Sequence, residues 1–178
     1  MNPEVEPEIT FMRALEEDVV SNFRAYREDT VSQTARRNFI RSECAYVEGM
    51  VWFFKKLVRS HIEDQRVSVD GEIKLYLFDF DFKVARSGKI EKKEKRLPTI
   101  DNLKALLKNC GEIYGYEVGL GKTGWSELQD TFRVRDRIMH PSSDKAITVS
   151  EAEMETGIRG HEWFGSERSK LLQILKNF

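Results

Sequence analysis

The sequence has few cysteines, no long apolar run and no excess of one charge. Only two of its 178 residues are cysteines, Cys44 and Cys110, and they form no CxxC or Cys/His pattern, which argues against a disulfide framework and a zinc site. The longest apolar run, "MVWFF", is far shorter than the roughly 20 residues of a membrane span. The N-terminal "MNPEVEPEIT" is acidic and lacks the apolar region of a signal peptide. We therefore expect a soluble cytoplasmic protein, without membrane contact, in which both thiols are buried.

Charged residues are abundant, but they cancel. Lysine and arginine number 29 against 30 aspartates and glutamates, so no global field draws the protein to nucleic acid or membrane. Any binding of a polyanion must come from a local patch. A chain of this length is expected to form one compact core, so residues 1–178 are predicted to be a single domain.

Apolar residues recur at helical spacing over most of the chain. The spacing predicts a first helix that Thr10 caps, a second helix over about 30–62 that packs antiparallel to it, and a third helix that Thr99 caps. A further helix should bury four apolar residues and end near His140: Trp125, Leu128, Phe132 and Ile138.

The last helix has the clearest predicted start. Ser150 and Glu153 form a capping box, and Val149 and Met154 are placed as a hydrophobic staple. We expect the helix to continue to Ile174, with a break near Gly165.

Residues 64–98 do not follow one period. The stretch "GEIKLYLFDFDFKV" alternates like a strand, although Asp70 would also suit the cap of a short helix, and "ARSGKIEKKEKRLP" indicates a turn and a charged return. The sequence thus predicts an all-α fold, an up-and-down bundle of four or five helices with a small irregular or hairpin insertion around residues 64–98.

The stretch "RVRDRIMHP" (133–141) holds the residues best suited to phosphate chemistry. Arg135 offers a planar, permanently charged phosphate clamp, His140 offers proton transfer near neutral pH, and Asp136 can orient either. At about 100° per residue, Arg135 and His140 point roughly 140° apart, so they meet only if the last turn before Pro141 loosens. Arg133 also fits the spacing. The plainer alternative is a histidine that the helix dipole favours at a C-terminus.

Other charged residues of interest lie on the second predicted helix. Glu48 lies in an apolar stretch and needs a partner, either Arg41 or a residue of "RDRIMH", unless it lies on a solvated stripe. The patch "ARRNFIR" is either a solvated face or a contact for the RNA backbone. Candidate RNA-binding residues are Arg36, Arg37, Arg133 and Arg137.

Nothing in the sequence predicts a metal or a cofactor. "GLGKTG" lacks the glycine that a phosphate-binding loop requires at Tyr116, and no buried strand precedes it, so we interpret it as a flexible connection. His61 and His161 have no acidic or cysteine partner at a ligand spacing and are interpreted as ordinary helix residues.

An arginine, a polar neighbour and a histidine at a helix end resemble the signature of HEPN domains. The stretches "RRNFIRSECAYVEGMV", "SGKIEKKEKRLPTIDNLK" and "VSEAEMETGIRGHEWF" are also similar to parts of bacterial HEPN-like proteins. The resemblance implies a metal-independent endoribonuclease of a toxin–antitoxin or antiphage system. It further implies a homodimer whose two motifs face one cleft, with RNA and an antitoxin protein as partners.

Carried over to this chain, the resemblance assigns the family's arginine to Arg135, its polar neighbour to Asp136 and its histidine to His140. Cleavage would use the 2′-OH of RNA as nucleophile and leave a 2′,3′-cyclic phosphate, so DNA should be inert. The alternative is a non-catalytic helical module that binds RNA, a nucleotide or a protein partner.

Overall fold

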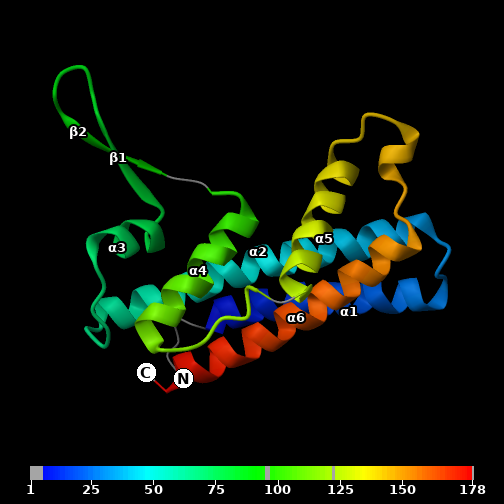
Figure 1. The fold of residues 1–178 in the computed structure, drawn as a ribbon, viewed down its shortest axis with the longest axis horizontal. Helices are drawn as coiled ribbons and strands as arrows, with labels where there is room; N and C mark the ends of the chain where they lie inside the picture. The colour runs from blue at the N-terminus through cyan, green and yellow to red at the C-terminus, as the bar shows by residue number, and fades with distance from the viewer. Residues whose placement is uncertain (1–5, 95–96, 122, 178) are drawn as a thin grey trace. The chain divides into compact units, whose positions relative to one another are not determined.

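Helices make up most of the chain, as the sequence predicts. The structure, a computed structural model, describes residues 6–94, 97–121 and 123–177. The helices and strands in this part of the chain are α1 Glu6–Glu28, α2 Gln33–Glu63, α3 Gly71–Leu77, β1 Phe80–Val84, β2 Ile90–Glu94, α4 Thr99–Tyr114, α5 Thr123–Met139, the 3₁₀-helix η1 Asp144–Ile147 and α6 Glu151–Lys176. The predicted all-α bundle with a hairpin insertion is confirmed (Figure 1).

The chain divides into two compact units. Unit 1 consists of residues up to 53 and residues 119–170, and unit 2 consists of residues 54–118 and 171 onward. The single domain over 1–178 stays a prediction. None of the described helices is long and apolar enough to cross a membrane.

In unit 1, α1 and α2 run antiparallel, as predicted. Phe11 near the start of α1 packs edge-on against Trp52, with ring centroids 6.2 Å apart, whereas Phe23 near its end packs against Phe39 at 5.5 Å. Asp29 shapes the tight turn between the helices, since its carboxylate accepts hydrogen bonds from two backbone amides that follow it.

Helices α5 and α6 of unit 1 are also antiparallel. Contacts between them pair the start of one helix with the end of the other, at Trp125–Trp163, Leu128–Gly160 and Arg137–Glu153. The backbones approach so closely at Gly160 that a Cβ there would lie 2.9 Å from the Leu128 nitrogen. The four residues predicted to be the buried side of α5, from Trp125 to Ile138, are all buried, so α5 is held in a fixed rotation.

The capping box of α6 is confirmed. The Ser150 amide donates to Glu153 Oε2 at 2.8 Å, and the Glu153 amide donates to Ser150 Oγ at 3.2 Å. Val149 and Met154, the predicted staple, are both fully buried. The expected break near Gly165 is wrong, because α6 is continuous through it.

Two predicted caps are wrong. Thr10 lies inside α1, which already includes Glu6 and Pro7. Proline suits the first turn of a helix because it has no amide hydrogen that would need a partner there. Thr99 is the first residue of α4 rather than its cap, and Pro98 occupies the cap position.

Unit 2 carries the insertion, which contains both the short helix and the strand that its sequence suggested, one after the other. Asp70 caps the short helix α3 by accepting the Ile73 amide at 2.8 Å. The alternating stretch then forms β1, which pairs with β2 in an antiparallel hairpin. Gly88, with φ of 81°, closes the turn in a left-handed conformation that suits glycine.

Ion pairs of the half-exposed Asp79 anchor the start of the hairpin within unit 2. Asp79 has a φ of 56°, which is unusual for a residue with a side chain, and it lies between α3 and β1. Its carboxylate pairs with Lys55, which is almost fully buried, and with Arg59 at 2.6 Å. Burial lowers the pKa of Lys55 despite the pairing with Asp79. These contacts fix the point from which the hairpin leaves the helices.

Candidate functional site

His140 lies directly after the last residue of α5, with its side chain exposed. Its backbone amide donates to the Asp136 carbonyl at 3.1 Å, which is the regular α-helical bond. The final turn therefore does not loosen, and Arg135 and His140 stay about 140° apart around the helix. Within the described residues the His140 side chain makes no hydrogen bond or ion pair, so its imidazole is open to a ligand.

Arg135 points to the other side of α5, where two carboxylates hold it. Its Nη2 donates to Glu48 Oε1 on α2 at 2.7 Å, and its Nε lies 3.4 Å from Asp136 Oδ1. The guanidinium also lies over the Phe132 ring at 5.2 Å. Of the two partners considered for Glu48, the structure provides the one on the "RDRIMH" helix.

Arg41, the other partner considered, is exposed. It makes no hydrogen bond or ion pair with any residue that the structure describes. Its guanidinium remains available to an external anion.

Arg133 and Arg137 lie one turn apart on the side of α5 opposite to Arg135. A groove of about 420 Å³ runs along this side between α5 and α6. It is lined by Asp130, Arg133, Val134, Arg137, Ala152, Glu153 and Thr156. His140 follows Arg133 by seven residues, which is about 20° short of two full turns of a helix. The histidine therefore shares the side of Arg133 rather than that of Arg135.

Three of the predicted RNA-binding arginines are occupied by the loop that follows His140. Arg36 is 9% exposed and donates to the Thr30 and Val149 carbonyls, both at 2.8 Å. Arg37 donates to the Ile147 carbonyl at 3.2 Å. Arg36 therefore does not lie on the solvated face that the sequence suggested, whereas Arg37 is half-buried and makes its bonds at the surface.

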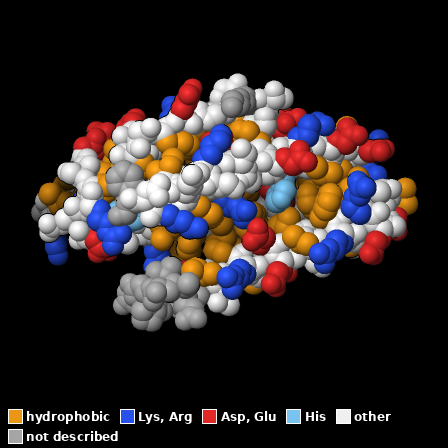
Figure 2. All heavy atoms as spheres, turned by 90° about the horizontal axis from the view of Figure 1, so that it is seen from below, with side chains coloured by type: hydrophobic (Ala, Val, Ile, Leu, Met, Phe, Trp, Pro, Cys, Tyr) orange, Lys and Arg blue, Asp and Glu red, His pale blue; other side chains and the backbone are white. Residues whose placement is uncertain are grey.

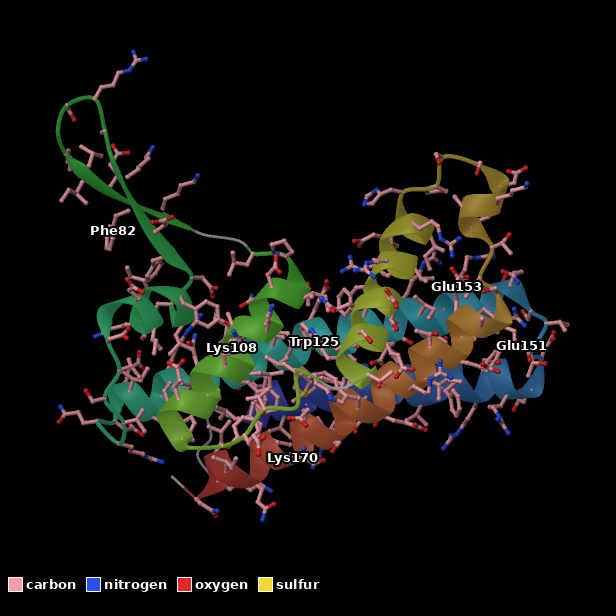
Figure 3. All side chains as sticks on the ribbon, in the orientation of Figure 1. Phe82, Lys108, Trp125, Glu151, Glu153 and Lys170 are labelled. Atoms are coloured by element: carbon pink, nitrogen blue, oxygen red, sulfur yellow. The ribbon has the colours of Figure 1, made fainter. Side chains whose placement is uncertain are left out.

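Arg137 is bound most extensively. Its Nη1 donates to the Ala146 carbonyl at 2.9 Å and to the Thr148 carbonyl at 2.8 Å, and its Nη2 donates to Glu153 Oε1 at 2.6 Å. Figure 3 labels Glu153 in the first turn of α6. These arginines fix the loop after His140, which leaves Arg133 as the exposed member of the predicted set, paired with Asp130.

Sequence reasoning missed an ion pair in unit 1 between a buried carboxylate and a half-buried histidine. Glu43 on α2 is 0% exposed, and its carboxylate bonds to Nδ1 of His161 on α6, so His161 does have an acidic partner. Burial alone would lower the pKa of His161, but the hydrogen bond and charge of Glu43 outweigh it and raise that pKa. The other oxygen of Glu43 is buried with no hydrogen-bond partner among the described residues.

A signal for this pair was present in the sequence. Glu43 follows Phe39 by four residues and precedes Tyr46 by three, so it lies on the apolar side of its helix, where a lone carboxylate is costly. His61 differs from His161 in that its Nδ1 meets the Tyr114 hydroxyl at 2.9 Å, and burial lowers its pKa.

The thiols and the glycine loop add no reactive group. Cys44 and Cys110 are both buried, as predicted, and burial raises the pKa of each, to about 12 for Cys110, so they stay protonated at neutral pH. Residues 115–121 form neither helix nor strand, and Lys122 of "GLGKTG" lies outside the described residues. No group of three or more potential metal ligands occurs in the part of the chain that the structure describes.

Basic and acidic side chains are interspersed on the face that Figure 2 shows, and apolar side chains lie between them. This agrees with the cancelling charges of the sequence. Comparison with protein-family models, with curated proteins and with solved structures finds no match. Function must therefore be argued from the residues themselves.

Proposed function

We propose that this chain is a metal-independent endoribonuclease in which His140 transfers protons and Arg135 stabilises the reacting phosphate. The observation that supports the proposal most is the state of His140. It is an exposed imidazole without a partner in the described residues, held on a regular helical turn five residues after an arginine that two carboxylates position.

The chemistry needs few groups because RNA supplies its own nucleophile. One imidazole takes the proton of the 2′-OH as its oxygen attacks phosphorus, and a second, protonated imidazole gives a proton to the 5′-oxygen as the P–O5′ bond breaks. A guanidinium stabilises the charge of the pentacoordinate phosphate. The products are a 2′,3′-cyclic phosphate and a 5′-OH.

One chain does not supply all these groups at one point. His140 and Arg135 point about 140° apart on α5, and one chain provides one such histidine. A two-fold dimer that brings the two α5 ends together would provide two His140 side chains and two Arg135 side chains. The proposed enzyme is therefore active as a homodimer, with Glu48 and Asp136 as the residues that position Arg135.

A second candidate is a module that binds RNA, a nucleotide or a protein without catalysis. It is favoured by the direction of the two side chains, because Arg135 and His140 point about 140° apart on α5 and do not converge on one phosphate within a chain. The toxin or antiphage role that the resemblance implies, and the cytoplasmic location expected from the composition, remain part of the proposal.

Cleavage of a labelled single-stranded RNA in excess chelator tests the proposal. We expect cyclic-phosphate ends from the purified chain, a loss of about 10²- to 10⁴-fold in rate for His140→Ala, and no cleavage of the all-deoxy oligonucleotide. Arg135→Ala and Arg133→Ala form a matched pair on opposite sides of one helix. A larger loss for Arg135→Ala assigns it as the phosphate residue, and a larger loss for Arg133→Ala assigns the groove side.

Equal rates for the wild-type chain and His140→Ala would refute the enzyme assignment. If RNA is then still bound, and Arg135→Ala or Arg133→Ala weakens that binding, the module without catalysis is the better account.

A further inference from the structure

Strand β1 of the hairpin in unit 2 carries apolar residues on one face and charged residues on the other. Phe80, Phe82 and Val84 share the first face, where the register pairs them with Glu94, Lys92 and Ile90 of β2, and Asp81, Lys83, Glu91 and Lys93 share the second. The apolar residues of the first face are open to solvent, since Phe82 is 54%, Val84 73% and Ile90 68% exposed. Figure 3 labels Phe82 on the hairpin. A two-stranded hairpin with an exposed apolar face is marginally stable alone.

The outer edge of β1 carries backbone groups that the hairpin ladder does not use. The Ala85 amide donates to the Lys89 carbonyl at 2.9 Å, so Ala85–Lys89 is a hydrogen-bonded pair. Such pairs alternate along an antiparallel ladder, which makes Phe82–Lys92 and Val84–Ile90 non-hydrogen-bonded pairs. The amide and carbonyl of Phe82 and Val84 therefore point away from β2. The Phe82 amide accordingly donates to the Asp81 side chain, at 2.8 Å, instead of to β2.

The sequence of β1, "FDFKV", is complementary to itself when it runs antiparallel about Phe82. Phe82 then faces Phe82 of a second strand, Phe80 faces Val84, and Asp81 faces Lys83. Apolar residues meet apolar residues on one face, and opposite charges meet on the other. In the hairpin Lys83 already pairs with Glu91 at 3.0 Å, so charges of alternating sign would continue across all four strands.

We propose that two copies of this chain associate through the β1 edge and form a four-stranded antiparallel sheet about a two-fold axis at Phe82. The Phe82 amide and carbonyl exchange hydrogen bonds with those of the partner copy, and Asp81 exchanges its contact with the Phe82 amide for the partner's Lys83. The inference rests on the hairpin alone and goes beyond the proposed ribonuclease. It does not assume that this contact brings the two His140 side chains together.

Other pairings of the same strands are less favourable. A parallel, in-register pair of β1 strands would place Asp81 beside Asp81 and Lys83 beside Lys83. The strand β2, "IEKKE", would place its central Lys92 positions opposite each other in an antiparallel pair. A symmetric β1 pair also closes on itself, whereas a β1–β2 contact between copies would continue into a filament.

Two charge-exchanged variants test the pairing and leave the hairpin's own pairs intact. The first combines Asp81→Lys with Lys93→Glu, and the second combines Lys83→Glu with Glu91→Lys. Each keeps opposite charges across β1 and β2 but places like charges opposite each other between copies. Sedimentation velocity of the full chain over a concentration series should show a dimer for the wild type and a dissociation constant raised roughly tenfold or more for each variant alone.

Mixing the two variants gives the sharper outcome. An equimolar mixture restores opposite charges at both positions and should dimerise like the wild type. A wild-type chain that stays monomeric, or variants that dimerise as tightly as the wild type, would overturn the proposal.

A cysteine on the two-fold axis provides a second readout that does not depend on charge. Facing Cα atoms of a hydrogen-bonded antiparallel pair lie about 5.5 Å apart, within reach of a disulfide. Phe82→Cys should therefore form a covalent dimer under mild oxidation. Val84→Cys is the control, because its two copies would lie roughly 13 Å apart along the strands. Equal cross-linking of the two variants, or none, contradicts the proposed axis.

Discussion

Among single residues, Glu43 and His161 are the pair whose environment constrains them most. The Glu43 carboxylate lies between α2 and α6 of unit 1 with 0% exposure, and His161 Nδ1 is its hydrogen-bond partner. Removing one member of a buried charged pair leaves the other without compensation, which costs about 3–5 kcal/mol. His161→Ala leaves the buried Glu43 carboxylate without its partner and should approach that cost. Glu43→Gln removes the buried charge itself and should cost less.

The same pair predicts how stability depends on pH. Burial lowers the pKa of His161, but Glu43, aided by Glu162, outweighs burial and the charge of Arg168 and raises it above the ordinary 6.5. A histidine whose pKa is raised on folding adds stability below its unfolded pKa and loses that contribution as pH rises through the folded pKa. The free energy of unfolding should therefore fall as pH rises above about 6.5. Urea unfolding at several pH values measures it.

Two variants make this pH test specific. Glu43→Gln should flatten the fall in stability above pH 6.5, because the carboxylate that favours the charged imidazole is gone. His140→Ala is the control, since its side chain has no partner among the described residues and should leave the profile unchanged. A profile that Glu43→Gln does not alter would show that His161 is not the titrating group.

At the scale of single residues, the sequence does not predict which partner each charged side chain binds. Glu48 is 43% exposed, so it lies on the solvated stripe that the sequence had left open, and it still pairs with Arg135. The partners of Arg36 and Arg137 could not be predicted from the sequence, because these side chains bind backbone carbonyls of a loop. Every residue has a backbone carbonyl, and secondary structure leaves only a few of these carbonyls without a donor. No pattern of side chains in the sequence shows which carbonyls these are, so the arginines that bind them could not be predicted.

At the scale of elements, the loop between α5 and α6 depends on Arg137. This side chain is 33% exposed, and it joins the carbonyls that end η1 to the Glu153 carboxylate in the first turn of α6. Arg137→Ala leaves several of these acceptors without a donor. We expect a loss of about 2 kcal/mol in the free energy of unfolding and faster amide hydrogen exchange over residues 144–149.

Arg133→Ala is the matched control for that loss. Its side chain is 75% exposed, and its one ion-pair partner among the described residues is Asp130 on the same helix, so the change should cost less than about 0.5 kcal/mol. Equal losses for the two arginines, measured by urea unfolding, would mean that the loop does not depend on Arg137.

The helices themselves were predictable, and their ends were predictable only where a side chain caps them. Ser150 and Glu153 marked the start of α6 correctly because the box satisfies two amides at once. Thr10 and Thr99 misled because Pro7 and Pro98 lie at the true helix starts, and proline brings no amide that needs a cap. In the insertion, an aspartate cap and an alternating pattern follow each other within a few residues, too few for periodicity to separate them.

At the scale of the whole molecule, the cancelling charges limit how the RNA of the proposed function would bind. Of the six arginines considered for RNA or phosphate, Arg36, Arg37 and Arg137 are bound to backbone carbonyls. The three that could still meet phosphates are Arg41, Arg133 and Arg135. The formal net charge of −1 adds no long-range attraction.

This small set predicts a weak dependence of RNA affinity on salt. Each phosphate neutralised on a single strand contributes about −0.7 to the slope of log K against log salt concentration, so three contacts from one chain give a slope of about −2, and six from both chains of the proposed dimer give about −4. Fluorescence anisotropy with His140→Ala, which should bind without cleaving, measures the slope. Arg41→Ala should make it shallower by about 0.7, and Arg37→Ala should leave it unchanged because that arginine is bound to the loop. A slope steeper than about −5, or a change with Arg37→Ala as large as with Arg41→Ala, would mean that RNA contacts a basic surface other than these three arginines.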